Sequence, residues 1–167
     1  MDLSTILRFM LAKTTVTETT DLGISGDIVV RLCKDLPNHQ NYKIYCDNRF
    51  SSPQLFCSLK NLGILPIQTV RYNRLCHCIL KSDKELKQPG RGSFDYKTDT
   101  QNNIIAVKWY DNKAVHLLST YKRIHPLAVV QRWSSDKEYV DVPRPEIVKQ
   151  YNLFMGRVNL HDMLVAL

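Results

Sequence analysis

The chain has 167 residues, of which 44% are hydrophobic and 23% charged, a globular composition that excludes a disordered tail. This length is enough for one ordinary core, or for a core with a small inserted module. The apolar stretch over residues 6–12 includes Arg8, is too short to cross a bilayer and has no signal-peptide cleavage site. A soluble intracellular protein with no membrane partner is therefore expected.

The net charge of +7 is concentrated in the middle of the chain, where residues 60–132 carry 13 basic and 5 acidic side chains. A concentrated basic region attracts polyanions because binding releases their condensed counterions, so DNA is the first partner to consider. A solvated lysine-rich surface is the alternative. The candidate phosphate contacts are Arg71, Arg74, Lys81, Lys84, Lys87 and Arg91.

The five cysteines are an odd number in mostly apolar surroundings, a pattern that favours reduced, buried thiols over a disulfide framework. The run Cys76-His77-Cys78 has the donor types of a zinc site. It has no second ligand pair at the usual spacing, and a zinc centre is not predicted here.

The first part of the chain has the pattern of a parallel α/β unit. Residues 24–36 predict a helix with Ser25 as its N-cap and Pro37 beyond its end. The later elements are a strand at 42–46, a helix at 52–62 and a strand at 64–70, and residues 4–10 are apolar enough for a short strand. Strand, helix and strand with short joints predict a parallel pair.

Residues 72–144 predict a β-rich insertion separate from that unit. A hairpin is expected from strands at 104–109 and 114–119 with a turn at Asp111-Asn112, and residues 129–133 and 138–142 add two more strands. Trp109 and Trp133 are expected to pack in the core of this insertion rather than to stack on nucleobases.

A helix returns after Pro145. Its apolar residues recur at three- and four-residue steps, and Asp162 falls within that stripe. A buried carboxylate is costly, so Asp162 requires a metal ion, a basic partner or an exposed helix end.

Asp47 lies directly between a strand and a helix, at the end of the run Ile44-Tyr45-Cys46. Nucleases and transposases that hold divalent metals place a carboxylate at such a junction. A turn or helix-capping aspartate has the same local setting, and the two interpretations stay open at this point.

Three blocks in register make the chain resemble a piggyBac-type transposase. The first block is Asp47-Asn48-Arg49-Phe50-Ser51-Ser52, continued by Thr69-Val70-Arg71-Tyr72-Asn73-Arg74. The second is Val107-Lys108-Trp109-Tyr110-Asp111-Asn112-Lys113. The third is Tyr151-Asn152 with Met155-Gly156-Arg157-Val158-Asn159-Leu160-His161-Asp162.

The resemblance implies an α/β fold, namely a partial ribonuclease H-like (DDE/D transposase) core with a β-rich insertion domain. The implied boundaries are 1–71 for the first part of the core, 72–144 for the insertion and 145–167 for the returning helix. It also implies DNA cleavage and strand transfer with two Mg²⁺ ions held by aspartates, a nuclear location, and a dimer with a related transposase.

The resemblance assigns ancestral catalytic positions to Asp47 and Asp162, with Asp47 as a Mg²⁺ ligand. The chain differs from the family pattern at three points. The opening strands with the family's first aspartate are expected to be lacking, Asn159 stands where an aspartate is expected, and Arg157 replaces a glycine. An amide offers a metal only a neutral carbonyl oxygen, so the two-metal site should be severely weakened.

The resulting expectation is an inactive transposase-derived fragment that keeps sequence-independent DNA affinity and needs no cofactor. Two alternatives stay open. One is an active Mg²⁺-dependent transposase or nuclease that takes carboxylates from missing segments or a partner chain. The other is a protein-interaction module, or a decaying relic, without a role on DNA.

Overall fold

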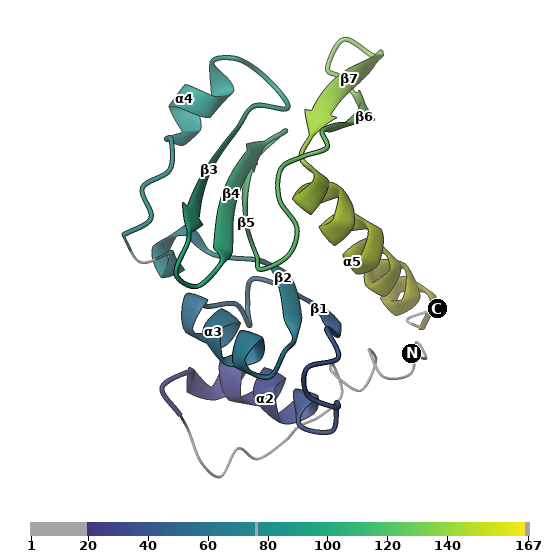
Figure 1. Cartoon of the computed structure of the whole chain (residues 1–167). Helices are drawn as coiled ribbons and strands as arrows, with labels where there is room; N and C mark the ends of the chain where they lie inside the picture. The colour runs from purple at the N-terminus through teal and green to yellow at the C-terminus, as the bar shows by residue number, and fades with distance from the viewer. Residues whose placement is uncertain (1–19, 76, 166–167) are drawn as a thin grey trace.

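The computed structural model describes residues 20–75 and 77–165, with side chains described as far as Gly156. Figure 1 shows a mixed sheet with helices on both faces and a separate two-stranded ribbon. The strand predicted at residues 4–10 and the side chains of Cys76, Asn159 and Asp162 lie outside the described part. The zinc hypothesis for the run that begins at Cys76 therefore stays untested.

The predicted parallel unit is present. Strand β1 (Lys43–Cys46) runs parallel to β2 (Leu65–Thr69), with Lys43 opposite Leu65, and helix α3 (Pro53–Asn61) connects them. Ser52 is the N-cap of α3, because its side chain accepts a hydrogen bond from the Leu55 N–H at 3.2 Å. Gly63 follows the helix with φ +70°. A side chain there would collide with the backbone of His39, so the turn into β2 requires glycine.

Helix α2 (Gly23–Cys33) is shorter than the predicted 24–36, and its cap differs from the prediction. Ser25 lies inside the first turn rather than at the N-cap, which is Leu22 and has no side-chain cap. The segment entering the helix is held instead by Asp27, which accepts a hydrogen bond from the Thr20 N–H at 3.0 Å. Ser25 was the wrong choice because a polar residue near a helix start can also occupy the first turn.

A single five-stranded sheet crosses the predicted boundary between core and insertion. Its order is β1-β2-β5-β4-β3, where β3 is Phe94–Asp99, β4 is Ile104–Tyr110 and β5 is Ala114–Ser119. Strand β5 pairs antiparallel with β2, placing Ser119 opposite Ile67. The strands β3–β5 therefore continue the sheet of the α/β part, while the boundaries 72–144 of the insertion stay a prediction. The sequence could not reveal this pairing, because the hydrogen bonds that satisfy the edge of β2 come from a distant segment.

The hairpin of β4 and β5 confirms the predicted strands at 104–109 and 114–119. The ribbon of β6 (Ala128–Trp133) and β7 (Tyr139–Arg144) also matches the predicted strands. Strand β3, helix α4 (Asp83–Lys87) and the short 3-10 helix η1 (Tyr72–Arg74) were not predicted. Strand β3 is an edge strand with mostly exposed side chains, so its polar composition gives no alternating apolar signal.

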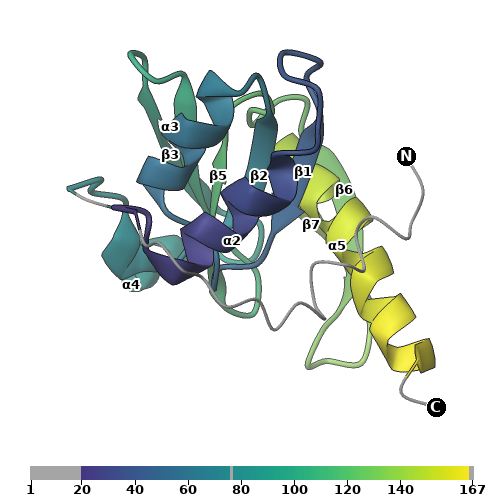
Figure 2. The same cartoon turned by 90° about the horizontal axis from the view of Figure 1, so that it is seen from below.

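The two faces of the sheet carry different helices (Figure 2). On one face, Ile147 and Val148 of α5 (Glu146–Val165) pack with Val107 of β4 and Leu117 of β5. On the opposite face, Phe56 of α3 packs with other apolar residues of β4 and β5. These residues alternate along the two strands with Val107 and Leu117, which face α5. A third cluster joins α2 to α3 through buried Val29, Cys33, Cys46, Leu55, Leu59 and Ile64.

The two tryptophans have opposite environments. Trp109 is 4% exposed, and its indole N–H donates to the Pro143 carbonyl at 3.0 Å, which confirms its predicted core position. Trp133 is 57% exposed, and its ring meets the ring of Tyr139 edge-on with centroids 5.0 Å apart. The core prediction for Trp133 was wrong, because a two-stranded ribbon buries only one of its faces.

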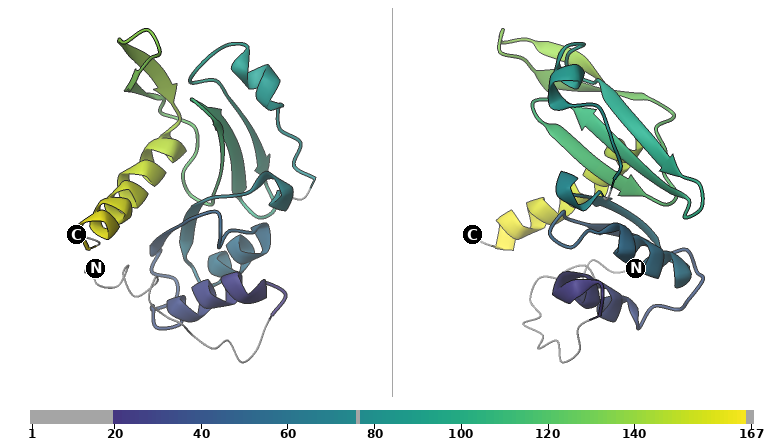
Figure 3. Two further views of the ribbon diagram at one scale, coloured as in Figure 1. Left: turned by 180° about the vertical axis from the view of Figure 1, so that it is seen from behind. Right: turned by 90° about the vertical axis from the view of Figure 1, so that its left-hand side faces the viewer.

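Helix α5 is docked on β1 through Tyr45. The Tyr45 ring stacks on Phe154 with centroids 4.4 Å apart, and its hydroxyl accepts a hydrogen bond from the Gln150 side-chain amide at 3.2 Å. The Tyr45 and Tyr121 hydroxyls lie 2.8 Å apart. Beyond these contacts α5 extends away from the sheet toward its C-terminal end (Figure 3).

Candidate nucleic-acid interface and the Asp47 loop

Asp47 follows β1 directly and begins the loop that leads into α3. Its main-chain carbonyl accepts hydrogen bonds from the Phe50 N–H at 3.1 Å and the Ser51 hydroxyl at 3.0 Å. Its carboxylate oxygen Oδ1 accepts the Asn48 N–H at 2.6 Å. The side chain is exposed. Asp47 therefore both shapes this turn and presents a carboxylate to solvent at the carboxyl end of a parallel strand.

Three elements meet at the Asp47 carboxylate. Thr69 is the last residue of the neighbouring strand β2, and its hydroxyl donates to Asp47 Oδ1 at 3.3 Å. The same Thr69 hydroxyl lies 3.2 Å from the Tyr151 hydroxyl on α5. Burial raises the pKa of Tyr151 to about 12, and the nearby Asp47 charge adds to this shift. Tyr151 is therefore neutral at physiological pH and can act as a hydrogen-bond donor.

Arg74, the last residue of the 3-10 helix η1 that follows β2, holds the Asp47 loop. Its Nη1 donates to the carbonyls of Asn48, Arg49 and Ser51 at 3.1, 3.2 and 3.0 Å. One guanidinium thus satisfies three carbonyls that the turn leaves without a secondary-structure partner. Arg74, proposed from the sequence as a phosphate contact, is a structural part of this loop.

The described residues do not supply a two-metal site around Asp47. Within the parts of the chain that the structure describes, no group of three or more His, Cys, Asp or Glu side chains could hold a metal ion. Two Mg²⁺ ions need several carboxylate ligands. Asp162 and Asn159 lie on α5, and the positions of their side chains relative to Asp47 are not among the described features.

The other basic residues predicted as phosphate contacts are either exposed or held by contacts within the chain. Arg71, Lys81, Lys84 and Lys87 are exposed. Arg91 is partly buried, because its Nε contacts the Asp111 carboxylate at 2.5 Å and its Nη1 donates to the Trp133 carbonyl at 3.1 Å. Arg91 therefore ties the β4–β5 turn to the β6–β7 ribbon.

A shallow, open depression lies between α4 and the β4–β5 turn, and it contains a lysine that the sequence reasoning missed. Lys84 and Lys87 line one side, and Asn112 and Lys113 line the other. Lys113 could have been found from the predicted hairpin, because it follows the expected turn at Asp111-Asn112 and must project from its tip.

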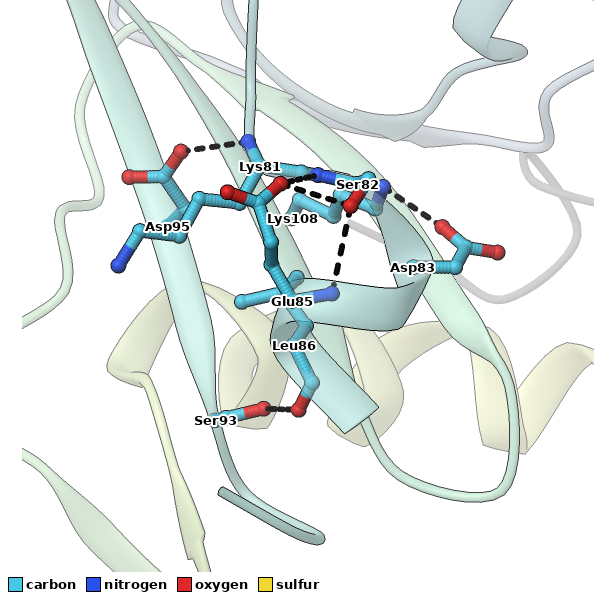
Figure 4. Close-up of polar contacts among 8 residues, drawn as sticks. All are labelled: Lys81, Ser82, Asp83, Glu85, Leu86, Ser93, Asp95 and Lys108. Atoms are coloured by element: carbon cyan, nitrogen blue, oxygen red, sulfur yellow. Dashed lines mark hydrogen bonds and ion pairs between the residues drawn. The ribbon is translucent and has the colours of Figure 1, made fainter. Parts of the chain in front are cut away.

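The start of α4 is fixed by a reciprocal capping box (Figure 4). The Ser82 hydroxyl accepts the Glu85 N–H at 3.3 Å, and Glu85 Oε2 accepts the Ser82 N–H at 2.7 Å. The pKa of Glu85 is lowered mainly by its hydrogen bonds from Ser82. Leu86 anchors the helix with 2% exposure. A helix of five residues is stable here because both its cap and its apolar contact are satisfied.

No helix among the described residues is both long and apolar enough to cross a membrane.

Comparisons with known proteins assign this chain to a family. The chain matches the family model described as Transposase IS4, a DDE transposase domain, over residues 4–166. It is 34% identical over 149 residues to PiggyBac transposable element-derived protein 3 of Homo sapiens, covering 87% of this chain and 25% of the relative. The identity to PiggyBac transposable element-derived protein 2 of Homo sapiens is also 34%, over 148 residues and the same shares.

The chain thus spans about a quarter of the length of these relatives. A solved structure, titled as a cryo-EM structure of piggyBac transposase synaptic complex with hairpin DNA, matches the fold with a TM-score of 0.62 at 21% identity. That match covers 90% of this chain and 29% of the solved chain. The chain belongs to the piggyBac transposase-derived protein family and carries part of its DDE transposase domain.

Proposed function

We propose that this chain is a DNA-binding part of a transposase-derived domain that binds duplex DNA without sequence preference and does not cleave DNA by itself. The observation that carries the proposal is the basic excess of residues 60–132, with 13 basic and 5 acidic side chains. Lysine contacts to phosphates supply affinity that is independent of base sequence. A DNA-binding role also agrees with the nuclear location implied by the resemblance.

The surface position of the basic residues supports DNA binding. Arg71, Lys81, Lys84 and Lys87 are exposed, so their charges can reach a ligand without desolvating the core. The solved relative is described by its title as a complex with hairpin DNA. A DNA partner is accordingly the polyanion that this basic surface fits best.

The acidic residues support the proposal that the chain does not cleave DNA by itself. Asp47 is exposed, and its Oδ1 already accepts hydrogen bonds from Asn48 and Thr69. The residue at position 159 is an asparagine, whose amide brings no charge to a metal. A two-Mg²⁺ mechanism needs carboxylates to offset the charge of both ions, and the described residues do not fit such a site.

We also infer that β1, α3, β2 and α5 belong to a ribonuclease H-like half-core, with the segment between β2 and α5 as its insertion. The parallel pair with Asp47 at its carboxyl end supports this assignment. The insertion then has two parts, since β3–β5 extend the sheet and β6–β7 form a ribbon of their own.

Two measurements test the proposed function. Fluorescence anisotropy of a labelled duplex, titrated at several salt concentrations, should give a log affinity that falls linearly with log salt. A flat response would remove the proposed DNA binding. Incubation with supercoiled plasmid and Mg²⁺ or Mn²⁺ should leave the plasmid intact. Nicking that is lost in Asp47→Ala would overturn the proposed inactivity and favour an active nuclease, which could take further carboxylates from a partner chain.

A further inference from the structure

The depression between α4 and the β4–β5 turn gathers three lysines from two distant segments. Lys84 and Lys87 are three residues apart on α4, so they lie on the same face of the helix. Lys113 reaches the depression from the turn after β4. All three are exposed, and none of them makes an ion pair among the residues that the structure describes. We call these three residues the lysine surface.

The acidic groups beside the lysine surface are already engaged. Asp83 also lines the depression, but its carboxylate contacts the Lys108 ammonium at 2.6 Å. Lys108 is 3% exposed and also donates to the Lys81 carbonyl at 2.7 Å (Figure 4). Glu85 is used by the α4 capping box. An anion that approaches Lys84 therefore meets one carboxylate, Asp83, whose charge is offset by Lys108, and a second, Glu85, that keeps its charge in the neutral capping box and is outnumbered by the three lysines.

Arg74 and Arg91 differ from the lysine surface, because both are held by contacts within the protein. Arg74 is committed to three loop carbonyls, and Arg91 is paired with Asp111. Replacing either arginine would mainly disturb the local fold rather than a contact with a ligand. The lysine surface has no such internal role, and its side chains keep the freedom to follow a ligand.

We propose that Lys84, Lys87 and Lys113 form a contact surface for the phosphate backbone of duplex DNA. The inference rests on the proposed DNA binding and adds where the phosphates lie. Duplex DNA carries one negative charge per about 1.7 Å of its axis, so a compact set of cations can contact adjacent phosphates. Lysine acts as a point charge and reads no base edge, so the contact is independent of sequence.

The test compares two triple variants of the whole chain by salt titration of duplex binding. One variant is Lys84→Gln, Lys87→Gln and Lys113→Gln. The matched control is Arg31→Gln, Lys34→Gln and Lys137→Gln, which removes the same charge from exposed positions outside residues 60–132. The first variant should lose about 1 from the magnitude of the log–log salt slope per lysine, or about 3 in total. The control should keep a slope close to that of the parent chain.

The outcomes separate the proposed DNA binding of the chain from the proposed role of the lysine surface. A flat titration of the parent chain would reject DNA binding itself. A steep parent slope that both variants share would reject the lysine surface and leave DNA binding standing. Loss of binding to phosphatidylserine vesicles with unchanged duplex binding would assign the surface to membranes and also reject the inference. Urea unfolding must show unchanged stability of both variants, as expected for exposed cationic side chains.

Discussion

The ammonium of Lys108 lies 2.6 Å from the carboxylate of Asp83, although the Lys108 side chain is 4% exposed and the Asp83 side chain is 73% exposed. A buried cation in the middle of β4 is thus held by an anion that stands in water. This asymmetry makes the pair informative, because loss of the anion leaves the cation uncompensated, while loss of the cation leaves a solvated carboxylate.

Asp83→Asn should lower the free energy of unfolding by about 1–2 kcal/mol, which is less than for a fully buried pair because water reaches the carboxylate. In the Lys108→Met background the same substitution should cost almost nothing. Urea unfolding of the parent, both single variants and the double variant measures this coupling. An equal cost of Asp83→Asn in both backgrounds would contradict the pairing.

The same pair predicts an acid dependence of stability. The hydrogen bond from Lys108 lowers the pKa of Asp83 below its ordinary value. Asp83 therefore contributes stability that is present above the unfolded-state pKa of about 3.9 and is lost as pH falls through the lower folded-state value. The difference in unfolding free energy between the parent chain and Asp83→Asn should shrink over that acid range. If this difference stays constant down to the lowest pH at which the chain folds, the pKa of Asp83 is not lowered by Lys108.

Arg74→Met should destabilise the Asp47 loop, because the carbonyls of Asn48, Arg49 and Ser51 all lose a donor. We expect a loss of about 1–3 kcal/mol in the free energy of unfolding, measured by urea titration. Arg71→Met removes the same charge from an exposed neighbour and should change stability by no more than about 0.5 kcal/mol. Equal effects of the two substitutions would mean that Arg74 contributes only its charge.

Trp109→Ala should cost about 3–5 kcal/mol, because it empties a core position and removes the donor to the Pro143 carbonyl. Trp133→Ala should cost less than about 1 kcal/mol, because more than half of that side chain is already in water. Iodide quenching gives a second readout. In Trp109→Phe the remaining fluorescence comes from Trp133 and should be readily quenched, and in Trp133→Phe it should be protected.

Alkylation of the folded chain should leave Cys33 and Cys46 unmodified. Burial raises the pKa of Cys33 to about 11 and that of Cys46 to about 12, so almost no reactive thiolate is present at pH 8. Iodoacetamide labelling followed by mass spectrometry should find both residues modified only after unfolding in urea. Rapid labelling of Cys46 in the native chain would show that the packing between β1 and α2 opens readily.

Local signals were enough to predict the elements that bury an apolar face or use a capping residue. Ser52, Pro53 and Gly63 mark α3 from both ends, and the apolar run of β4 before the turn at Asp111-Asn112 identifies a strand. Strand β3 and α4 were missed because both lie at the surface with polar side chains. The partner of β2 was missed for a different reason, since pairing between segments about 50 residues apart leaves no pattern in either one.

The candidate site was predictable to a similar degree. Asp47 could be placed after a strand because the apolar run and the capped helix flank it. The contact between Thr69 and Tyr151 could not be predicted, because it depends on how α5 crosses the sheet. The roles of Arg74 and Arg91 were hidden for the same reason. A sequence shows that an arginine is charged but not which carbonyl or carboxylate it meets.

The docking of α5 on Tyr45 has a kinetic consequence. The Gln150 side chain and the Tyr45 hydroxyl are 105 residues apart in the chain, so this contact forms only after a very long loop closes. Non-local contacts of this kind slow folding, because the entropy of closure is lost before the contact forms. The surface of β1 that carries Tyr45 should therefore stay uncovered until a late step. That interval is when the chain is most exposed to association through its unfinished sheet.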